Sequence, residues 1–161
     1  MKFVVDGMLG KLTRWLRMLG HDVEYSTKAG DAELIASAKA EERILLTRDF
    51  ELYRGAVRKG VEAFYTEGFT EEERLAEIAK RFKIRLEIDM KTSRCPKCNT
   101  EVMPVSKEQV ESKVQPNTFV NYEEFWQCPK CMQIYWRGAH WAKIGKTLEG
   151  ARRIMEAPQG R

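Results

Sequence analysis

The sequence lacks any apolar stretch long enough to cross a membrane. A transmembrane helix needs roughly 20 consecutive apolar residues, and no run among the 161 residues approaches that length. The first six residues read as a strand, with no hydrophobic leader after them. A hydrophobic content of 43% is typical of a globular protein. We therefore expect a cytoplasmic protein without a membrane partner, built from one moderate core and one small additional module.

Cysteine is also scarce, and all four cysteines fall in two short motifs. Cys95-Pro-Lys-Cys98 and Cys128-Pro-Lys-Cys131 are separated by 29 residues. Four thiolates at this spacing can close a tetrahedral zinc site with no open position, which is a structural site rather than a catalytic one. Disulfides of a secreted protein and a redox-active dithiol are the weaker alternatives. The spacing predicts a zinc ribbon over about residues 94–137, with structural Zn²⁺ bound by the four cysteines.

The charges are distributed unevenly along the chain. Residues 1–90 contain 16 Lys and Arg against 17 Asp and Glu, whereas residues 91–161 contain 12 against 7. A basic metal-binding module beside a nearly neutral one favours a polyanionic partner such as a nucleic acid. The alternative is that this mild basicity only aids solubility.

Apolar runs alternate with helical patterns through the first 90 residues. Short apolar runs predict strands at residues 2–6, 43–47 and 61–65, and residues 22–25 could form a further strand. Apolar residues at helical spacing predict helices at residues 8–19, 32–38, 51–59 and 70–82. We expect Asp31 to be a helix N-cap, and residues 84–88 to form an edge strand. The alternation predicts an α/β fold with a parallel sheet flanked by helices, followed by the ribbon and a partly helical tail over residues 138–161.

Three acids fall where a parallel sheet binds ligands. Asp6 and Asp49 follow predicted strands, and Asp31 begins a predicted helix, so all three could face the crevice at the carboxyl ends of the strands. Converging carboxylates favour a hard divalent cation such as Mg²⁺ or Mn²⁺. Metal ions held in this way can promote phosphodiester cleavage. Each acid taken alone could instead be only a turn or cap residue.

Several segments resemble those of one protein family. They are Phe3-Val4-Val5-Asp6-Gly7-Met8-Leu9-Gly10, Leu12-Thr13-Arg14-Trp15-Leu16-Arg17, Gly30-Asp31-Ala32-Glu33-Leu34, Arg43-Ile44-Leu45-Leu46-Thr47-Arg48-Asp49 and Tyr135-Trp136-Arg137-Gly138-Ala139-His140. With the two cysteine motifs, they make nearly the whole chain similar to the C-terminal ribonuclease domain of the Mut-seven exonuclease family. The resemblance implies a PIN-like nuclease domain over residues 1–90 with an appended zinc ribbon.

The same resemblance implies a catalytic site. It implies metal-dependent cleavage of RNA, with Mg²⁺ or Mn²⁺ held by Asp6, Asp31 and Asp49. Nucleases of this type often use a fourth acid, for which Glu33 is the candidate. At the second predicted helical position, Glu33 could alternatively only complement the helix dipole.

Basic residues close to the acids are candidate RNA contacts. Lys11, Arg14 and Arg17 recur every three residues on the first predicted helix, where they could hold phosphates or simply form a solvated face. Arg48 adjoins Asp49. It is a candidate either for stabilising transition-state charge or for a salt bridge with the acids.

The ribbon region is rich in aromatic residues. We expect Trp126 and Tyr135, close to the cysteines, to fill a small core. Trp136 and Trp141 are expected to be exposed, where they could stack on unpaired bases. His140 is a candidate RNA contact, or an ordinary surface histidine.

The combined expectation is a Mg²⁺- or Mn²⁺-dependent endoribonuclease. A PIN domain followed by a zinc ribbon is also the order in the endonuclease that trims small-subunit ribosomal RNA, so the ribosome or an rRNA precursor is a candidate partner. A toxin-type ribonuclease is another variant. The alternative from a different class is a non-catalytic RNA-binding or ribosome-associated protein with a vestigial acid cluster.

Overall fold

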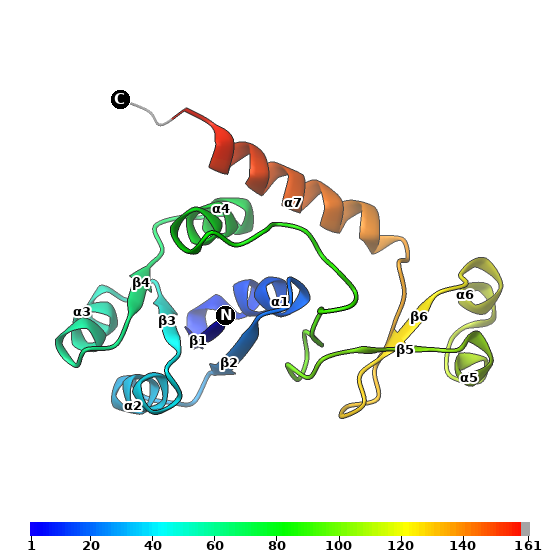
Figure 1. Cartoon of the computed structure of the whole chain (residues 1–161), viewed down its shortest axis with the longest axis horizontal. Coiled ribbons are helices and arrows are strands. Elements are labelled where there is room, and N and C mark those ends of the chain that lie inside the picture. Colours follow the sequence, from blue (N-terminus) through cyan, green and yellow to red (C-terminus); the bar gives the residue numbers. More distant parts are fainter. Residues whose placement is uncertain (159–161) are drawn as a thin grey trace.

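The computed structural model describes residues 1–158, which form a sheet module and a smaller ribbon module (Figure 1). The sheet module is built on four parallel strands: β1 (Lys2–Asp6), β2 (Asp22–Ser26), β3 (Ile44–Thr47) and β4 (Ala63–Tyr65). Their order in the sheet is β2-β1-β3-β4. In the central strand β1, Phe3 pairs with Val23 of β2 on one side and with Ile44 of β3 on the other. These pairs define the register of the three strands.

Helices cover both faces of this sheet. The 3₁₀ turn η1 (Gly7–Leu9), α1 (Gly10–Met18) and α4 (Glu71–Phe82) lie on one face, and α2 (Asp31–Glu41) and α3 (Phe50–Arg58) lie on the other (Figure 1). Successive residues of β1 therefore enter different cores: Phe3 and Val5 pack under α1 and α4, and Val4 packs under α2 and α3. This double coverage explains why the central strands β1 and β3 have continuous apolar runs rather than alternating ones.

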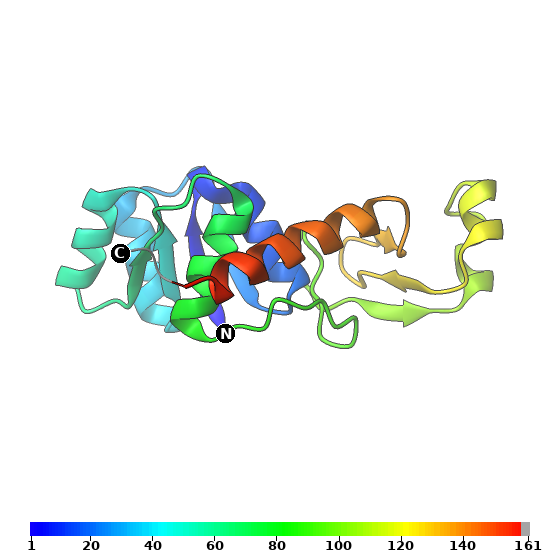
Figure 2. The ribbon, with the colours of Figure 1, turned by 90° about the horizontal axis from the view of Figure 1, so that it is seen from above.

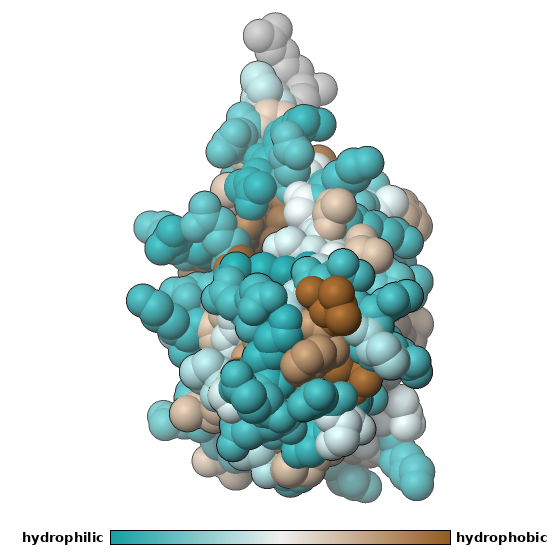
Figure 3. All heavy atoms as spheres, turned by 90° about the vertical axis from the view of Figure 1, so that its right-hand side faces the viewer, coloured by the Kyte–Doolittle hydropathy of each residue, from teal (hydrophilic) through white to brown (hydrophobic). Residues whose placement is uncertain are grey.

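The ribbon module has short strands in antiparallel order. β5 (Met103–Val105) pairs with β6 (Phe125–Gln127), which pairs with β7 (Ile134–Tyr135). Two short helices, α5 (Lys107–Val110) and α6 (Pro116–Asn121), lie between β5 and β6 at the end of the molecule farthest from the sheet (Figure 2). The face at this end is mostly hydrophilic, with a small apolar patch (Figure 3).

The last helix, α7 (His140–Glu156), returns from the ribbon to the sheet module. It runs along α4 (Figures 1 and 2), and Leu148 and Ala151 are buried in the same core as Phe3. The predicted partly helical tail is therefore a helix of 17 residues up to Glu156, and residues 159–161 of that prediction lie outside the described part. Within residues 1–158, no helix is both long and apolar enough to cross a membrane.

Two local predictions were wrong. Residues 84–88 form no strand; this extended segment leads from α4 to the ribbon, with Ile84 and Leu86 buried under the helices. Its alternating pattern reflects burial of every second side chain without strand pairing, and the Leu86 carbonyl accepts a hydrogen bond from Arg152 of α7. The N-cap of α2 is Gly30, so Asp31 is the first helical residue instead.

The first cysteine motif docks on the outer edge of β2. Asn99 accepts a hydrogen bond from the Val23 amide (2.9 Å) and donates one to Asp22 (2.8 Å). Arg17 donates to the Val23 carbonyl through Nη2 (2.7 Å) and to the Pro96 carbonyl through Nη1 (3.0 Å). An edge strand otherwise presents unpaired backbone groups. The junction therefore supplies hydrogen-bond partners to the free backbone groups of Val23 in β2. The same contacts join the two modules.

Candidate active site and zinc centre

The candidate active site lies where the direction of strand addition reverses. β2 is added on one side of β1, and β3 and β4 on the other. In an open parallel sheet, ligands bind at such a switch point, outside the carboxyl ends of the strands. Asp6 ends β1 and Thr47 ends β3, and their strands are direct neighbours. The two central strands thus bring Asp6 and the segment Thr47-Arg48-Asp49 to one place.

Thr47 connects two of the predicted acids. Its buried hydroxyl donates a hydrogen bond to Asp6 Oδ2 (2.8 Å) and accepts one from the Asp49 backbone amide (2.9 Å). This arrangement fixes the orientation of the Asp6 carboxylate relative to the turn that carries Asp49. Thr47 was not among the residues predicted for the site. The available signal was a hydroxyl residue at the end of a buried strand, two positions before an acid.

Asp49 is held in place as the N-cap of α3. Its Oδ1 accepts hydrogen bonds from the Glu51 amide (3.0 Å) and the Leu52 amide (3.2 Å). These bonds orient the carboxylate at the positive end of the helix. Oδ2 makes no hydrogen bond with any residue in the described range 1–158. One oxygen of Asp49 is therefore anchored, and the other is free for a ligand.

Asp31 and Glu33 lie in the first turn of α2, and both are exposed. Helix α2 follows the carboxyl end of β2, so it starts at the same edge of the sheet as Asp6. The three aspartates do not converge closely. Among the described residues, only the cysteines form a group of three or more His, Cys, Asp or Glu whose ligand atoms all lie within 4.8 Å of one another. The fixed pair is Asp6 and Asp49, with Asp31 and Glu33 on a neighbouring helix.

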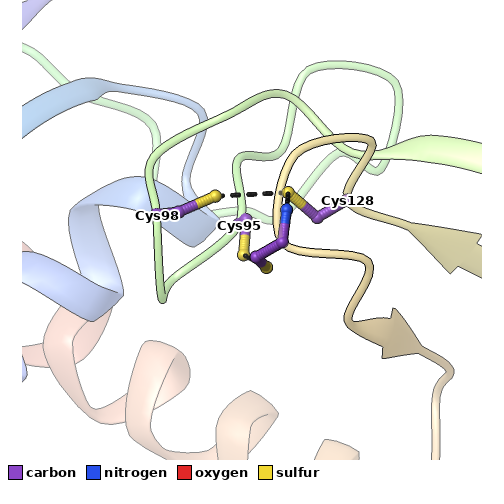
Figure 4. Close-up of side chains that lie close together, drawn as sticks. Cys95, Cys98 and Cys128 are labelled. Carbon is purple, nitrogen blue, oxygen red and sulfur yellow. Dashed lines mark hydrogen bonds between the residues drawn. The ribbon is translucent and has the colours of Figure 1, made fainter.

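The four cysteines form the second candidate site. Cys98 Sγ lies 3.2 Å from Cys128 Sγ (Figure 4). Cys95 Sγ lies 3.6 Å from Cys131 Sγ. A tetrahedral site with Zn–S bonds of about 2.3 Å separates its sulfurs by about 3.8 Å, whereas a disulfide has an S–S bond of about 2.0 Å. The cysteines are unbridged, and their geometry fits one zinc ion with no open coordination position.

The two cysteine motifs share one backbone geometry. In each, the amide of the first cysteine donates to the carbonyl five residues later, Thr100 or Gln133. The residue after the second cysteine, Asn99 or Met132, has a positive φ (74° and 67°) and donates its amide to the carbonyl of the first cysteine. The two motifs thus form equivalent turns, and together these turns bring the four Sγ atoms into one cluster.

The pKa values of the thiols are also consistent with a cation shared by the four cysteines. Burial would raise the pKa of the Cys98 thiol, but hydrogen bonding with Thr100 and neighbouring cysteines lowers it to about 6. For Cys131, a hydrogen bond from the Gln133 backbone lowers the pKa, but desolvation and the neighbouring sulfurs together outweigh it and raise the pKa to about 11. Crowded thiols cannot all ionise without a counter-charge, which a bound dication supplies. The Tyr135 hydroxyl also lies 2.9 Å from Cys95 Sγ, where it can donate to the thiolate.

A comparison with protein families agrees with this arrangement. The model of the Mut7-C RNAse domain matches residues 1–148. The chain belongs to the Mut7-C ribonuclease domain family. No curated protein and no solved structure matches it significantly. The match spans the sheet, the ribbon and the first half of α7, so the four-cysteine module belongs to the Mut7-C domain itself.

The basic residues predicted on α1 of the Mut7-C domain divide into two groups. Lys11 and Arg14 are exposed in the first turns of α1, which begins directly after η1 and Asp6. Arg17 is only 8% exposed, and its guanidinium binds the backbone of β2 and the ribbon. The Arg17 side chain therefore stabilises the junction between the modules. It is not exposed where it could bind a phosphate, contrary to the prediction.

Arg48 has an aromatic partner. Its guanidinium lies over the ring of Phe69, 4.9 Å from the centroid. Among the ion pairs of residues 1–158, none joins Arg48 to an acid, so the predicted alternative of a salt bridge with the acid cluster does not occur there. The Arg48 side chain remains beside Asp49 as a positive group.

The aromatic residues of the ribbon are mostly structural. Trp126 is buried beside the cysteines, and Tyr135 is half-buried against the same cluster. Trp136 is also half-buried, with its ring centroid 6.2 Å from that of Phe125. Trp141 packs beside Arg137, whose guanidinium lies 5.7 Å from the ring centroid. His140 is exposed at the start of α7.

A cavity separates the ribbon from α7. It has a volume of about 540 Å³ and is largely apolar. Its walls include Met18, Trp126, Trp136, His140 and Trp141. Met18 ends α1, and Asp6 precedes its start, so the cavity and the acids lie at opposite ends of that helix. The two predicted ribbon contacts, Trp136 and His140, therefore lie well apart from the acid pair.

Proposed function

We propose that the chain is a Mg²⁺- or Mn²⁺-dependent endoribonuclease with a PIN-like sheet module. The observation that supports this most is the Thr47 hydroxyl, which fixes Asp6 relative to Asp49 at the switch point of the sheet. Two orientated carboxylates without a basic partner are suited to a hard divalent cation. Asp31 and Glu33, exposed at the start of α2, are the proposed further acids.

The residues around this pair have distinct proposed roles. When bound, the cation would activate a water molecule and neutralise charge on the phosphate. Asp6 and Asp49 would hold it. Asp31 and the candidate fourth acid Glu33 would contribute from α2, although they form no tight cluster with this pair. Lys11 and Arg14 would position phosphates of the RNA backbone. Arg48 would stabilise the negative charge that develops in the transition state.

The proposed role of the ribbon is structural and positional. Four cysteines around one zinc ion leave no coordination position for a substrate. Trp136 and His140 are proposed to contact RNA at a distance from the acids. A ribosomal RNA precursor in the cytoplasm is the proposed natural substrate.

The test is cleavage of end-labelled single-stranded and hairpin RNA in Mn²⁺, Mg²⁺ or chelator. Asp6→Asn keeps an oxygen acceptor for Thr47, and Asp49→Asn keeps a good N-cap, so both variants remove charge with little effect on the fold. The matched control is Asp89→Asn, an exposed aspartate in the turn before the ribbon. Zinc content is measured in every sample, because a chelator can also remove zinc.

We expect metal-dependent internal cuts that fall at least about 100-fold in Asp6→Asn and Asp49→Asn but persist in Asp89→Asn. Full activity in both acid variants would refute the proposed site. RNA binding without cleavage under any metal condition would favour the alternative, a non-catalytic RNA-binding protein.

A further inference from the structure

Exposed aromatic rings gather beside the acid pair, at the carboxyl edge of the sheet. Phe50 directly follows Asp49 and is 53% exposed, and Phe69, in the loop after β4, is 78% exposed. Large apolar side chains at such exposure are unusual when several lie together. We call the group of Arg48, Phe50, Tyr53, Tyr65 and Phe69 the edge platform.

The ring of Phe50 is held by its neighbours. Its centroid lies 5.9 Å from that of Tyr53, with the planes inclined by 30°. It lies 5.5 Å from the centroid of Tyr65, which meets it edge-on at 85°. Tyr65 ends β4 and Tyr53 is on α3, so two regular elements fix the ring. A rigid ring loses little conformational entropy when a ligand stacks on it.

The second ring is joined to the acid pair through a cation. The Arg48 guanidinium stacks over Phe69 at 4.9 Å from the centroid, and Arg48 lies between Thr47 and Asp49 in the chain. Aromatic rings and guanidinium planes are the groups on which proteins stack unpaired bases, and the positive charge also suits the phosphates. The platform thus combines both parts of a nucleotide-binding surface, and two of its members, Arg48 and Phe50, adjoin Asp49 in the chain.

We propose that the edge platform binds unpaired bases of the RNA next to the scissile phosphate, by stacking on Phe50 and Phe69. The identity of the ligand as RNA rests on the proposed function. The inference goes further in placing the base contacts on α3 and the loop after β4, and in specifying single-stranded RNA. A duplex keeps its bases stacked internally, so it cannot use these rings.

A protein partner or a second copy of the chain is the other conceivable occupant of this surface. Phe50, Tyr53 and Val57 recur along one face of α3, and Val57 is 51% exposed. A protein docking on this face would bury Val57 together with Phe50. A base stacked beside Asp49 has no need of Val57, which lies two turns farther along the helix. Val57 therefore discriminates between the two occupants.

The experiment measures RNA binding rather than cleavage. The zinc-loaded full chain carrying Asp6→Asn is titrated into a single-stranded oligoribonucleotide containing 2-aminopurine, whose fluorescence is quenched by stacking. Phe50→Leu and Phe69→Leu are added to this background, with Phe50→Tyr as the conservative variant and Val57→Ser as the matched control. The same oligonucleotide annealed to its complement tests the requirement for unpaired bases. Circular dichroism checks the fold of each variant.

We expect each leucine variant to bind about tenfold more weakly, with loss of quenching, while Phe50→Tyr and Val57→Ser bind like the parent. The salt dependence of binding should not change, because no charge is altered. Parent-like binding by both leucine variants would overturn the proposal, as would equal binding of the duplex. Equal losses in Val57→Ser, with self-association of the parent in sedimentation, would assign the surface to a second copy instead.

The two proposals can fail separately. Platform-dependent binding by a chain that cleaves no RNA would refute the nuclease and leave the platform. Cleavage that depends on Asp6 but is unchanged in both leucine variants would refute the platform and leave the nuclease.

Discussion

The sheet module and the ribbon differ in how much apolar surface they bury. Among the described residues, sixteen buried ones form the core between the sheet and helices α1, α4 and α7. Seven more form the core between the sheet and helices α2 and α3. The ribbon has two small clusters, and its strands contain only two or three residues each. So small a sheet buries little apolar surface, and we therefore expect the ribbon to depend on a metal ion bound by its four cysteines.

This difference separates two kinds of metal chemistry in one chain. The four-cysteine site would leave no open position on a bound zinc ion; Cys95 and Cys128 are buried, whereas Cys98 is half-buried and Cys131 is exposed. The proposed catalytic site is open, with acids on a surface that the large core already makes rigid. The modules meet where Asn99 and Arg17 bind the edge of β2, so a ribbon folded around zinc also completes the sheet.

Removing zinc should have the largest effect. Cys128→Ser takes away a buried ligand, and a structural zinc site contributes about 10 kcal/mol to folding. We expect hydrogen exchange to show loss of amide protection in β5, β6 and β7 but retention in β1 and β3. Lys130→Ser, in the same motif, is the control and should keep both. Equal loss of protection in all strands would show that the sheet module has no stability of its own.

A cavity in the sheet core should have the next largest effect. Leu46 is fully buried in β3, and Leu46→Ala should lower the free energy of unfolding by about 2–5 kcal/mol. Thermal unfolding and zinc content would be measured on the same samples. We expect a lower Tm with zinc still bound, and little change in the exposed control Val57→Ala. Zinc loss in Leu46→Ala would contradict the independence of the ribbon fold.

The junction allows a matched pair of glycine substitutions. Asn99→Gly tolerates the positive φ of 74° but removes two hydrogen bonds to β2, at a cost of about 1–3 kcal/mol because the Val23 amide loses its partner. Met132→Gly, at the equivalent position of the other motif, should be neutral or stabilising, since glycine relieves its φ of 67°. Thermal unfolding of the zinc-loaded variants checks both. Similar Tm values for the two variants would mean that the two Asn99 hydrogen bonds contribute nothing to stability.

Acidic pH should weaken the sheet module slightly through His21. Burial, and then the charges of the N-terminal amine and Arg94, lower the pKa of His21 to about 4, below its ordinary value of 6.5. Between these values the unfolded chain binds a proton that the folded chain does not, so stability falls as the pH drops from 6.5 towards 4. The loss is about 1–2 kcal/mol, because the ring is partly solvated.

The measurement for His21 is urea unfolding at pH 5 and at pH 7, on zinc-loaded protein and on His21→Gln. The glutamine variant should lose less stability between the two pH values than the parent. The account of His21 fails if the two proteins show the same pH dependence while zinc stays bound.

The sequence predicted the regular parts of this structure well. Four short strands and one cluster of four cysteines were expected, and the structure has both. The alternation of apolar and polar residues at 84–88 led to a wrong prediction of a strand. Ile84 and Leu86 are buried under helices, but this segment pairs with no strand. Periodicity records which side chains are buried, but not what buries them.

The site was predicted less completely, because it depends on contacts between distant segments. Asp6 and Asp49 could be located from strand ends, whereas the Thr47 hydroxyl between them depends on the register of β1 and β3. Arg17 follows the same three-residue spacing as Lys11 and Arg14, which gave no sign that it would be buried. Its burial depends on contact with Pro96, which lies 79 residues later in the chain. The edge platform likewise requires α3 and β4 to be adjacent.

Binding of Mn²⁺ to the zinc-loaded chain tests the separation of the two metal sites most directly. Electron paramagnetic resonance counts free and bound Mn²⁺ in the parent, Asp6→Asn, Asp49→Asn and Asp89→Asn, with zinc content measured in parallel. The account predicts bound Mn²⁺ in the parent and Asp89→Asn, its loss in the other two, and unchanged zinc in all four. Equal Mn²⁺ binding by all four proteins would contradict it.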